Sequence, residues 1–254
     1  MKRNGVKLTG RTILITGGSS GIGLALATQL ARRGNTLILT GRDGAKLDAA
    51  RRALPSVHTM VSDVSDPAAI ADLHGRAIAA FPALDTLVNN AGIMRSLALD
   101  APRDLLDLTR EIDCNLSGPL RMVQQFLPQL ASRPEALIVN VSSGLAFVPL
   151  PSTPIYCATK AALHAYTLSL RAQLAGSRVR VVELAPPAVD TPLLQGAFAS
   201  GAMDATVLAT RAIAAIEAGS LEIAPGAARL LRIMGRAAPD FMLAQLVRMT
   251  KAQT

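Results

Sequence analysis

Short apolar runs alternate with longer segments of helical period along most of the chain. Six runs that are rich in β-branched and other apolar residues predict strands. They cover Thr12–Thr16, Thr36–Thr40, Val57–Val61, Thr86–Val88, Ala136–Val141 and Val179–Leu184. Residues 13–15, 37–39 and 137–141 are apolar almost throughout. That pattern is typical of strands covered on both faces in a parallel sheet.

Helical periodicity fills the intervals between these runs. It predicts helices over about 21–33, 44–53, 67–80, 103–131, 155–175 and 204–219. Strands that alternate with helices imply right-handed crossovers, so we expect an α/β fold with a Rossmann-like, doubly wound parallel sheet and helices on both of its faces. No low-complexity linker or break in composition divides the chain. Residues 1–254 are therefore expected to form one domain.

The alternation changes after about residue 185. Residues 186–203 are rich in turn-forming and small residues, and we expect them to act as a lid over a substrate. Residues 226–254 carry five basic residues and one acid, which predicts a basic helical extension. Pro239 should separate its first helix from a second one over 241–249. The first helix carries three arginines on one face: Arg229, Arg232 and Arg236.

Composition excludes several classes of protein. Half of the 254 residues are apolar and 17% are charged, which excludes a disordered or fibrous chain. Cys114 and Cys157 are too few for a disulfide framework or a four-ligand zinc site. The N-terminus lacks the apolar run of a signal peptide, and no apolar window is long enough to span a membrane. We expect a reduced, cytoplasmic protein.

The formal net charge of +8 raises the question of nucleic acid or anionic membranes as partners. The basic residues, however, form scattered pairs with acids between them, and the chain has no Trp to stack on bases. We therefore expect no nucleic-acid partner. The three histidines, His58, His74 and His164, do not have the spacing of metal ligands. No metal is expected.

A glycine-rich segment follows the first predicted strand directly and opens the first helix. It reads Thr16-Gly17-Gly18-Ser19-Ser20-Gly21-Ile22-Gly23. Glycines let a backbone turn tightly and approach a pyrophosphate, and the helix N-terminus supplies unpaired N–H groups. A glycine-rich loop alone is also compatible with a plain turn, but here the required strand–loop–helix context is present. The segment predicts a dinucleotide site.

Tyr156 and Lys160 lie four residues apart at the start of a predicted helix, so their side chains share one face. An isolated tyrosine has a pKa near ~10, and a nearby ammonium group is expected to lower it. Such a tyrosine can give a proton to a carbonyl oxygen while a hydride arrives from a nicotinamide. Ser143 follows the fifth strand and can hydrogen-bond the same oxygen, with Ser142 as the competing residue. The alternative for the Tyr–Lys pair is an exposed helix surface.

Together these motifs resemble the short-chain dehydrogenase/reductases over about residues 9–195. The order of the motifs carries the resemblance: the loop Thr16–Gly23, then Asp63-Val64, then Asn89-Asn90-Ala91-Gly92, then the set Asn115, Ser143, Tyr156 and Lys160. Within that family the chain looks most like the branch of oxidoreductases named after the D-alanyl-lipoteichoic-acid operon. This narrower likeness rests on the stretches 40–47 and 221–226.

The resemblance implies roles for individual residues. Asn115, Ser143, Tyr156 and Lys160 would be catalytic, with the Asn115 carbonyl helping to hold a water that links Lys160 to solvent. Lys160 would also bind the nicotinamide ribose. The cofactor would further contact Gly17, Ser19, Ser20, Gly21, Ile22, Gly23, Asp63, Val64, Asn90, Ala91, Gly92, Pro186, Val189 and Thr191. Pro187 stands where the family usually has glycine, which puts the nicotinamide end in doubt.

Charge at the end of the second strand predicts which nicotinamide cofactor is used. An NAD enzyme normally places an acid there, on the ribose diol, but by alignment this chain has Gly41 followed by Arg42. A guanidinium group at this position can bind a 2′-phosphate and stack on adenine. Asp43 comes one residue late and can cap the next helix instead. We expect NADP, although Arg42 also fits a solvated loop charge.

The expected substrate is a lipophilic ketone or aldehyde, or the corresponding alcohol. Leu145, Phe147, Val148 and Pro149 follow Ser143 and would form an apolar pocket wall. By resemblance, the helices over 103–131 and 155–175 would make the contacts of a homodimer or homotetramer. Two alternatives differ in kind: a non-catalytic dinucleotide-binding regulatory or scaffold protein, and a reductase whose basic C-terminal helix lies on a membrane. Packing of that helix at an interface or over the pocket is favoured.

Overall fold

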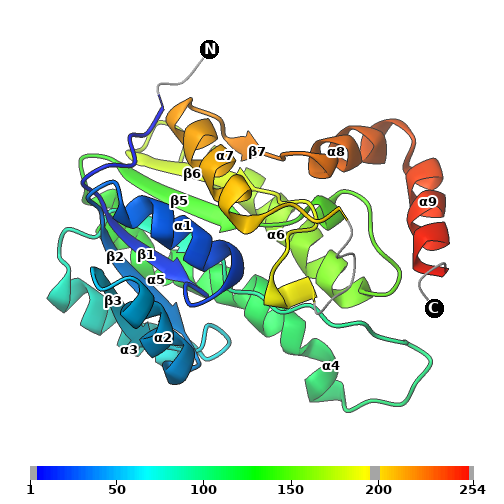
Figure 1. Cartoon of the computed structure of the whole chain (residues 1–254), viewed down its shortest axis with the longest axis horizontal. Coiled ribbons are helices and arrows are strands. Elements are labelled where there is room, and N and C mark those ends of the chain that lie inside the picture. Colours follow the sequence, from blue (N-terminus) through cyan, green and yellow to red (C-terminus); the bar gives the residue numbers. More distant parts are fainter. Residues whose placement is uncertain (1–4, 195–200, 252–254) are drawn as a thin grey trace.

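The computed structural model describes residues 5–194 and 201–251 and places seven parallel strands in one sheet (Figure 1). The strands are β1 (Thr12–Thr16), β2 (Thr36–Gly41), β3 (Val57–Val61), β4 (Thr86–Asn89), β5 (Ala136–Val141), β6 (Val179–Leu184) and β7 (Glu222–Ile223). Their order across the sheet is β3-β2-β1-β4-β5-β6-β7. The chain thus winds outwards in both directions from β1 and β4, and the predicted α/β, doubly wound fold is confirmed.

Two layers of helices cover the sheet. The core contacts place α1, α2 and α7 on one face and α3, α5 and α6 on the other. The long helices are α1 (Gly21–Ala31), α2 (Gly44–Ala53), α3 (Pro67–Ala80), α4 (Leu105–Ile112), α5 (Gly118–Ala131), α6 (Pro154–Gln173), α7 (Ala205–Glu217), α8 (Ala227–Ala237) and α9 (Pro239–Lys251). Short turns are the π-helix η1 (Asp113–Ser117) and the 3-10 turns η2 (Gly144–Ala146) and η3 (Pro192–Leu194).

Burial on both faces explains why the central strands are apolar at nearly every position. In β1, Ile13 and Ile15 pack under α1 and α7, whereas Leu14 packs with the opposite layer. All three side chains are fully buried. Side chains alternate between the faces of a strand, so a strand covered on both sides has no position left for a polar residue to reach water.

The six predicted strands agree with the structure to within one residue, but two features were not predicted. The segment expected as one helical stretch over 103–131 is interrupted by η1, which separates α4 from α5. The two-residue strand β7 was also missed, and it extends the sheet beyond β6 through the pairs Glu183↔Glu222 and Leu184↔Ile223. Both features bear on the site described below.

The C-terminal extension forms two helices, α8 and α9, which lie at one end of the molecule (Figure 1). The break expected near Pro239 is confirmed, because α9 begins at that residue. α8 packs on the turn η2. A Cβ on Gly235 would lie 2.6 Å from the Phe147 carbonyl oxygen, so the two backbones are in close contact. Residues 195–200 of the expected lid lie outside the described residues.

Candidate active site

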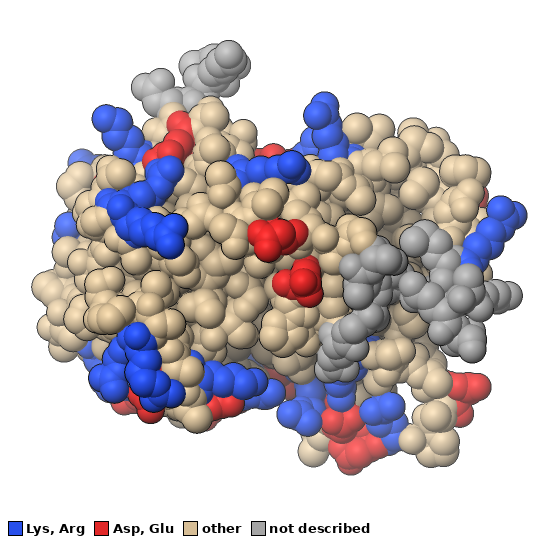
Figure 2. Space-filling view, in the orientation of Figure 1, with Lys and Arg blue, Asp and Glu red and all other residues tan. Residues whose placement is uncertain are grey.

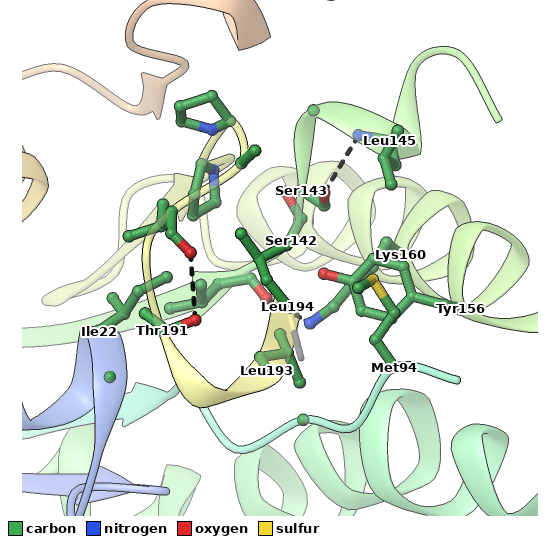
Figure 3. Close-up of a pocket in the computed structure, with 18 of the residues that line it drawn as sticks. Ile22, Met94, Ser142, Ser143, Leu145, Tyr156, Lys160, Thr191, Leu193 and Leu194 are labelled. Carbon is green, nitrogen blue, oxygen red and sulfur yellow. Dashed lines mark hydrogen bonds between the residues drawn. The ribbon is translucent and has the colours of Figure 1, made fainter. Parts of the chain in front are cut away.

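A cavity of about 300 Å³ lies beyond the carboxyl ends of β1, β4, β5 and β6 (Figure 3). In a doubly wound sheet this edge, where the strand order reverses, is where ligands bind. The segments that line the cavity are the glycine loop, the turns after β4 and β5, the first turns of α6, residues 186–194, and parts of α8 and α9.

The loop after β1 and the turn after β4 are held tightly together. The Asn90 amide donates to the carbonyl oxygens of Thr16 (2.9 Å) and Gly17 (3.1 Å). In return, the Thr16 hydroxyl accepts from the backbone N–H groups of Asn90 and Ala91, each at 3.0 Å. A Cβ on Gly23 would lie 2.4 Å from the Gly17 carbonyl oxygen, so only glycine fits there. Asn90 therefore shapes the loop.

The N-terminus of α1 is free to bind an anion. Ser20 is its N-cap but makes no side-chain capping bond, and the first turn contains no acid. Ser20, Gly21 and Ile22 all line the cavity. Unpaired N–H groups at such a terminus attract negative charge. Ser19 lies beside the end of β2, because its hydroxyl oxygen is 3.6 Å from the place of a Cβ on Gly41.

At the end of β2, the acid Asp43 has a partner, whereas the base Arg42 has none among the described residues. Asp43 accepts a hydrogen bond from the Lys46 backbone N–H at 3.1 Å and thereby caps α2. The capping role considered for Asp43 is thus confirmed. Arg42 is exposed and has neither a hydrogen-bond nor an ion-pair partner within residues 5–194 and 201–251. Its guanidinium group is available to a ligand.

The pair Asp63-Val64 follows β3 at the same sheet edge. Asp63 accepts from the backbone N–H (2.9 Å) and the hydroxyl (2.7 Å) of Ser65, which fixes the turn. Val64 is buried, and its carbonyl oxygen lies 2.8 Å from the place of a Cβ on Gly118 at the start of α5. Val64 is therefore held against the start of α5, directly after η1.

Tyr156, Ser143 and Lys160 meet in the cavity, and all three are buried. The Lys160 ammonium donates to the Val141 carbonyl oxygen at 2.9 Å and lies 5.6 Å from the centre of the Tyr156 ring. The Ser143 side chain lies beside the Tyr156 phenol, whose pKa it lowers, and its oxygen accepts from the Leu145 backbone N–H at 3.1 Å (Figure 3). The structure thus brings together the three residues that the sequence predicted.

The competing residue, Ser142, has another partner. Its hydroxyl donates to the Glu183 carboxylate on β6 at 2.5 Å. Ser143 is therefore the serine that the tyrosine contacts, as the spacing favoured.

Burial determines the protonation states of Tyr156 and Lys160. It raises the pKa of Tyr156 to about 12, and the hydrogen bond with Ser143 only partly opposes this rise. It lowers the pKa of Lys160 to about 8. The Tyr156 pKa is thus raised rather than lowered as expected, because loss of solvent is the largest influence on it. Tyr156 is a neutral phenol at pH 7, which is the form that can donate a proton.

Asn115 is buried in η1 and ties the turn after β4 to α6. Its side chain exchanges two hydrogen bonds of 2.8 Å with the backbone of Ile93 and donates to the Thr159 hydroxyl at 3.2 Å. A Cβ on Gly92 would lie 3.3 Å from the Asn115 oxygen and 3.6 Å from the Lys160 nitrogen. Asn115 and Lys160 therefore approach the same glycine.

Residues 186–194 fold over the glycine loop. The Pro186 carbonyl accepts from the Gly144 N–H at 2.8 Å, which links this segment to the turn after β5. The Thr191 hydroxyl donates to the Val189 carbonyl at 3.2 Å, and its side chain lies 3.1 Å from the place of a Cβ on Gly21 (Figure 3). Pro186, Val189 and Thr191 all line the cavity, as expected.

The predicted apolar wall is only partly right. Leu145 lines the cavity, but Phe147, Val148 and Pro149 do not. The Phe147 ring packs edge-on against His164 with a centroid distance of 5.1 Å. Val148 is buried beneath the surface, and Pro149 is exposed. The 3-10 turn η2 redirects the chain after Leu145, which the sequence pattern does not reveal.

Other apolar residues supply the missing wall. Met94 follows β4 and Leu150 precedes α6, while Leu231 and Leu246 come from α8 and α9. The amphipathic pattern of the C-terminal extension contained a signal for these leucines, but it did not show which face meets the cavity. The extension thus covers the site with one of its sides.

Residues 5–194 and 201–251 contain no group of three His, Cys, Asp or Glu side chains arranged to hold a metal ion. Within those ranges, every helix is too short or too polar to cross a bilayer.

Comparison with known proteins places this geometry among related chains. The family described as short chain dehydrogenase matches residues 11–200. The chain is 47% identical over 191 residues to the uncharacterized oxidoreductase DltE of Bacillus subtilis, covering 75% of this chain and 76% of that protein. It is 37% identical over 183 residues to sulfoacetaldehyde reductase 2 of Chromohalobacter salexigens, covering 70% and 73% of the two chains.

Solved structures agree with the fold and differ in the cofactor they contain. A short chain dehydrogenase from Burkholderia cenocepacia J2315 in complex with NADP has a TM-score of 0.84 and 28% identity, over 95% of this chain and 99% of that one. A short chain dehydrogenase/reductase from Burkholderia phymatum in complex with NAD has a TM-score of 0.81 and 28% identity, over 91% and 95%.

The buried ammonium group predicts a pH-dependent stability. A pKa lowered from 10.5 to about 8 means that the folded protein holds the Lys160 proton less tightly than the unfolded chain does, at a cost of about 3 kcal/mol below pH 8. We expect Lys160→Met to raise the free energy of unfolding by about 2 kcal/mol at pH 7, since about 1 kcal/mol is lost with the bond to Val141. Because the wild type recovers stability as pH rises, the difference should shrink by about 1.4 kcal/mol per unit above pH 8.

Urea unfolding of both proteins between pH 7 and 10 measures this difference. Lys46→Met, at an exposed lysine of α2, is the matched control and should show no such trend. A constant difference between Lys160→Met and wild type across that range would contradict the prediction.

Proposed function

The chain belongs to the short-chain dehydrogenase/reductase family, in the branch of the DltE-like oxidoreductases, and we propose that it is an NADP(H)-dependent oxidoreductase for lipophilic ketones, aldehydes or the corresponding alcohols. One observation carries the proposal: Ser143, Tyr156 and Lys160 meet in a cavity whose other side chains are mainly apolar. The nicotinamide, when bound, would supply or accept the hydride.

The residues of the chain would bind and protonate the substrate. The Ser143 hydroxyl donates a hydrogen bond to the carbonyl oxygen and stabilises the charge that develops on it. The neutral Tyr156 phenol transfers its proton to that oxygen during reduction and takes it back during alcohol oxidation. Lys160 holds the tyrosine in place through α6 and would bind the nicotinamide ribose, while the Asn115 carbonyl would help to hold a water next to Lys160.

The cofactor would lie along the sheet edge. Its pyrophosphate fits the N-terminus of α1, where N–H groups are free and glycines leave room. The residues proposed to contact it are Gly17, Ser19, Ser20, Gly21, Ile22, Gly23, Arg42, Asp63, Val64, Asn90, Ala91, Gly92, Tyr156, Lys160, Pro186, Val189 and Thr191.

Three observations at the end of β2 support NADP rather than NAD. Gly41 offers no carboxylate to a ribose diol. The carboxylate of Asp43 is used to cap α2. Arg42 has no partner among the described residues, so its guanidinium group can bind a 2′-phosphate without breaking an existing ion pair.

The lining of the cavity supports a lipophilic substrate. Lys160 is the only charged side chain among the described residues that line it, and the part near α8 and α9 is formed by leucines and Met94. An anionic substrate would find no guanidinium group to bind its charge there.

The alternatives have less support. A scaffold protein has no chemical need for the converging Ser143, Tyr156 and Lys160. Two observations on the C-terminal extension favour packing over the pocket rather than on a membrane: Leu231 lines the cavity, and Arg232 forms an ion pair with Glu222 at 2.8 Å.

We also propose a cytoplasmic location without a nucleic-acid partner. On the face shown in Figure 2, basic side chains are dispersed and interspersed with acids.

We further propose a homodimer or homotetramer that uses the stretch of α4, η1 and α5 together with α6. Helix α4 extends from the body of the molecule (Figure 1), and the outward residues Leu105 and Leu106 are 76% and 81% exposed. Leucines this exposed on an amphipathic helix indicate a covered surface in the assembled protein.

The reaction is tested by carbonyl reduction with Tyr156→Phe. Wild type is expected to oxidise NADPH in the presence of bulky apolar ketones or aldehydes. Removal of the phenol proton beside Ser143 should lower kcat by about 10²–10⁴-fold. Tyr166→Phe, at the other tyrosine of the chain, should retain wild-type activity. Equal activity of Tyr156→Phe and wild type would overturn the assigned role.

Cofactor preference is tested by fluorescence titration with NADPH and NADH. We expect wild type to bind NADPH more tightly. Arg42→Ala should weaken NADPH binding by about tenfold or more, because one charge-assisted contact is lost, and change NADH binding by less than about twofold. Arg52→Ala, at an exposed arginine near the other end of α2, is the control. Preference for NADH, or no effect of Arg42→Ala, would refute the assignment.

Assembly is tested by light scattering after gel filtration. The double variant Leu105→Asp with Leu106→Asp should shift the wild-type oligomer towards smaller species, because it places carboxylates in the proposed interface. Leu230→Asp, at a leucine of α8 that is 55% exposed, should leave the mass unchanged. A monomeric wild type would rule out this interface.

A further inference from the structure

One face of α6 is connected to three successive residues at the end of β5, 141–143. Tyr156, Lys160 and His164 follow one another at intervals of four, so their side chains lie along one side of the helix. Tyr156 contacts Ser143, and the Lys160 ammonium donates to the Val141 carbonyl oxygen. The residue between these two, Ser142, is held through the third side chain of the row.

This third connection runs through a carboxylate on β6. The Ser142 hydroxyl donates to one oxygen of Glu183, and His164 Nδ1 lies 2.7 Å from the other. Ser142 and Glu183 are almost completely buried, and the His164 side chain is 15% exposed. The proposed reaction does not use Glu183 or His164.

The surroundings of His164 fix its orientation. Its ring packs against Phe147 of the turn after Ser143. The charged groups that face it are Glu183 on β6, Glu222 on β7 and Arg236 on α8. The hydrogen bond to Glu183 raises the pKa of His164 above its usual value. Nδ1 donates to Glu183 in the protonated ring and in the Nδ1–H tautomer of the neutral ring, so the buried carboxylate gains a second donor beside Ser142.

We propose that Glu183 and His164 are positioning residues, which hold Ser142 and thereby fix the neighbouring Ser143 hydroxyl for the substrate oxygen. Backbone rotation at Ser142 would move the Ser143 oxygen, and a displacement of about 1 Å at a reacting group can cost about 10²-fold in rate. This inference rests on the proposed function, in which Ser143 binds the carbonyl oxygen. The claim that Glu183 and His164 fix the position of Ser143 does not rest on it, because the Leu145 N–H donates to the Ser143 oxygen and its exchange reports on that oxygen directly.

Four variants test the proposal with two independent readouts. Ser142→Ala and His164→Leu each remove one link. His164→Asn keeps a donor at the place of Nδ1 and should restore the link. Glu222→Gln is the matched control, because it removes a carboxylate near His164 that does not contact Ser142. The readouts are kcat for carbonyl reduction at saturating NADPH and hydrogen exchange of the Leu145 amide by NMR.

Ser142→Ala and His164→Leu should each lower kcat by about tenfold, with the KM for NADPH changed by less than about twofold, and should speed Leu145 exchange by about tenfold. His164→Asn and Glu222→Gln should match wild type in both readouts. Wild-type kcat and exchange in Ser142→Ala would overturn the proposal, and so would equal losses in His164→Leu and His164→Asn, which would indicate packing alone.

The two readouts separate this proposal from the proposed function. If wild type reduces no carbonyl compound, the proposed function fails, while Leu145 exchange still decides whether the pair positions Ser143. If His164→Leu does not fold, Ser142→Ala carries the test, because it removes a single oxygen atom.

Discussion

The hydrogen bond from the Lys160 ammonium to the Val141 carbonyl is the contact on which the site depends. It joins α6 to the end of β5 in a place without solvent, where an ammonium group is costly unless its protons are bound. Because Tyr156 lies one helical turn earlier, this bond also determines where the phenol lies relative to Ser143. The approach of Asn115 to Gly92 closes the same place from the turn after β4.

Loss of solvent drives both groups of the pair towards their neutral forms. The pKa of Tyr156 rises and that of Lys160 falls, so the site combines a proton donor with a weakly held ammonium proton. The leucines and Met94 that line the cavity add to this effect. They exclude water and so strengthen each remaining hydrogen bond. The apolar lining and the neutral Tyr156 phenol are therefore connected, because both go with the exclusion of water from the site.

The features that were predicted correctly from the sequence are those that depend on a local pattern of residues. Strands such as β1 and β5 are apolar at nearly every position because both faces are covered, and the glycine loop, Ser143, Tyr156 and Lys160 stand at fixed spacings. The missed features depend on distant partners or small changes in geometry. β7 has two residues and exists through its pairing with β6. The π-helix η1 around Asn115 differs from an α-helix in its hydrogen bonds, and the hydrophobic pattern of the sequence does not distinguish the two. The direction of Phe147 depends on a turn that α8 packs against.

Pro187, which stands where the family usually has glycine, lies between the cofactor end of the cavity and the C-terminal extension. A glycine there would bring an N–H group and freedom for positive φ, whereas proline has neither. The adjacent Pro186 carbonyl still accepts from the Gly144 N–H, so the link to the turn after Ser143 survives. The Pro187 ring lines the cavity and faces Gly226, whose φ of +60° turns the chain into α8. The same wall of the cavity therefore borders both the proposed nicotinamide contacts and the leucines of α8 and α9.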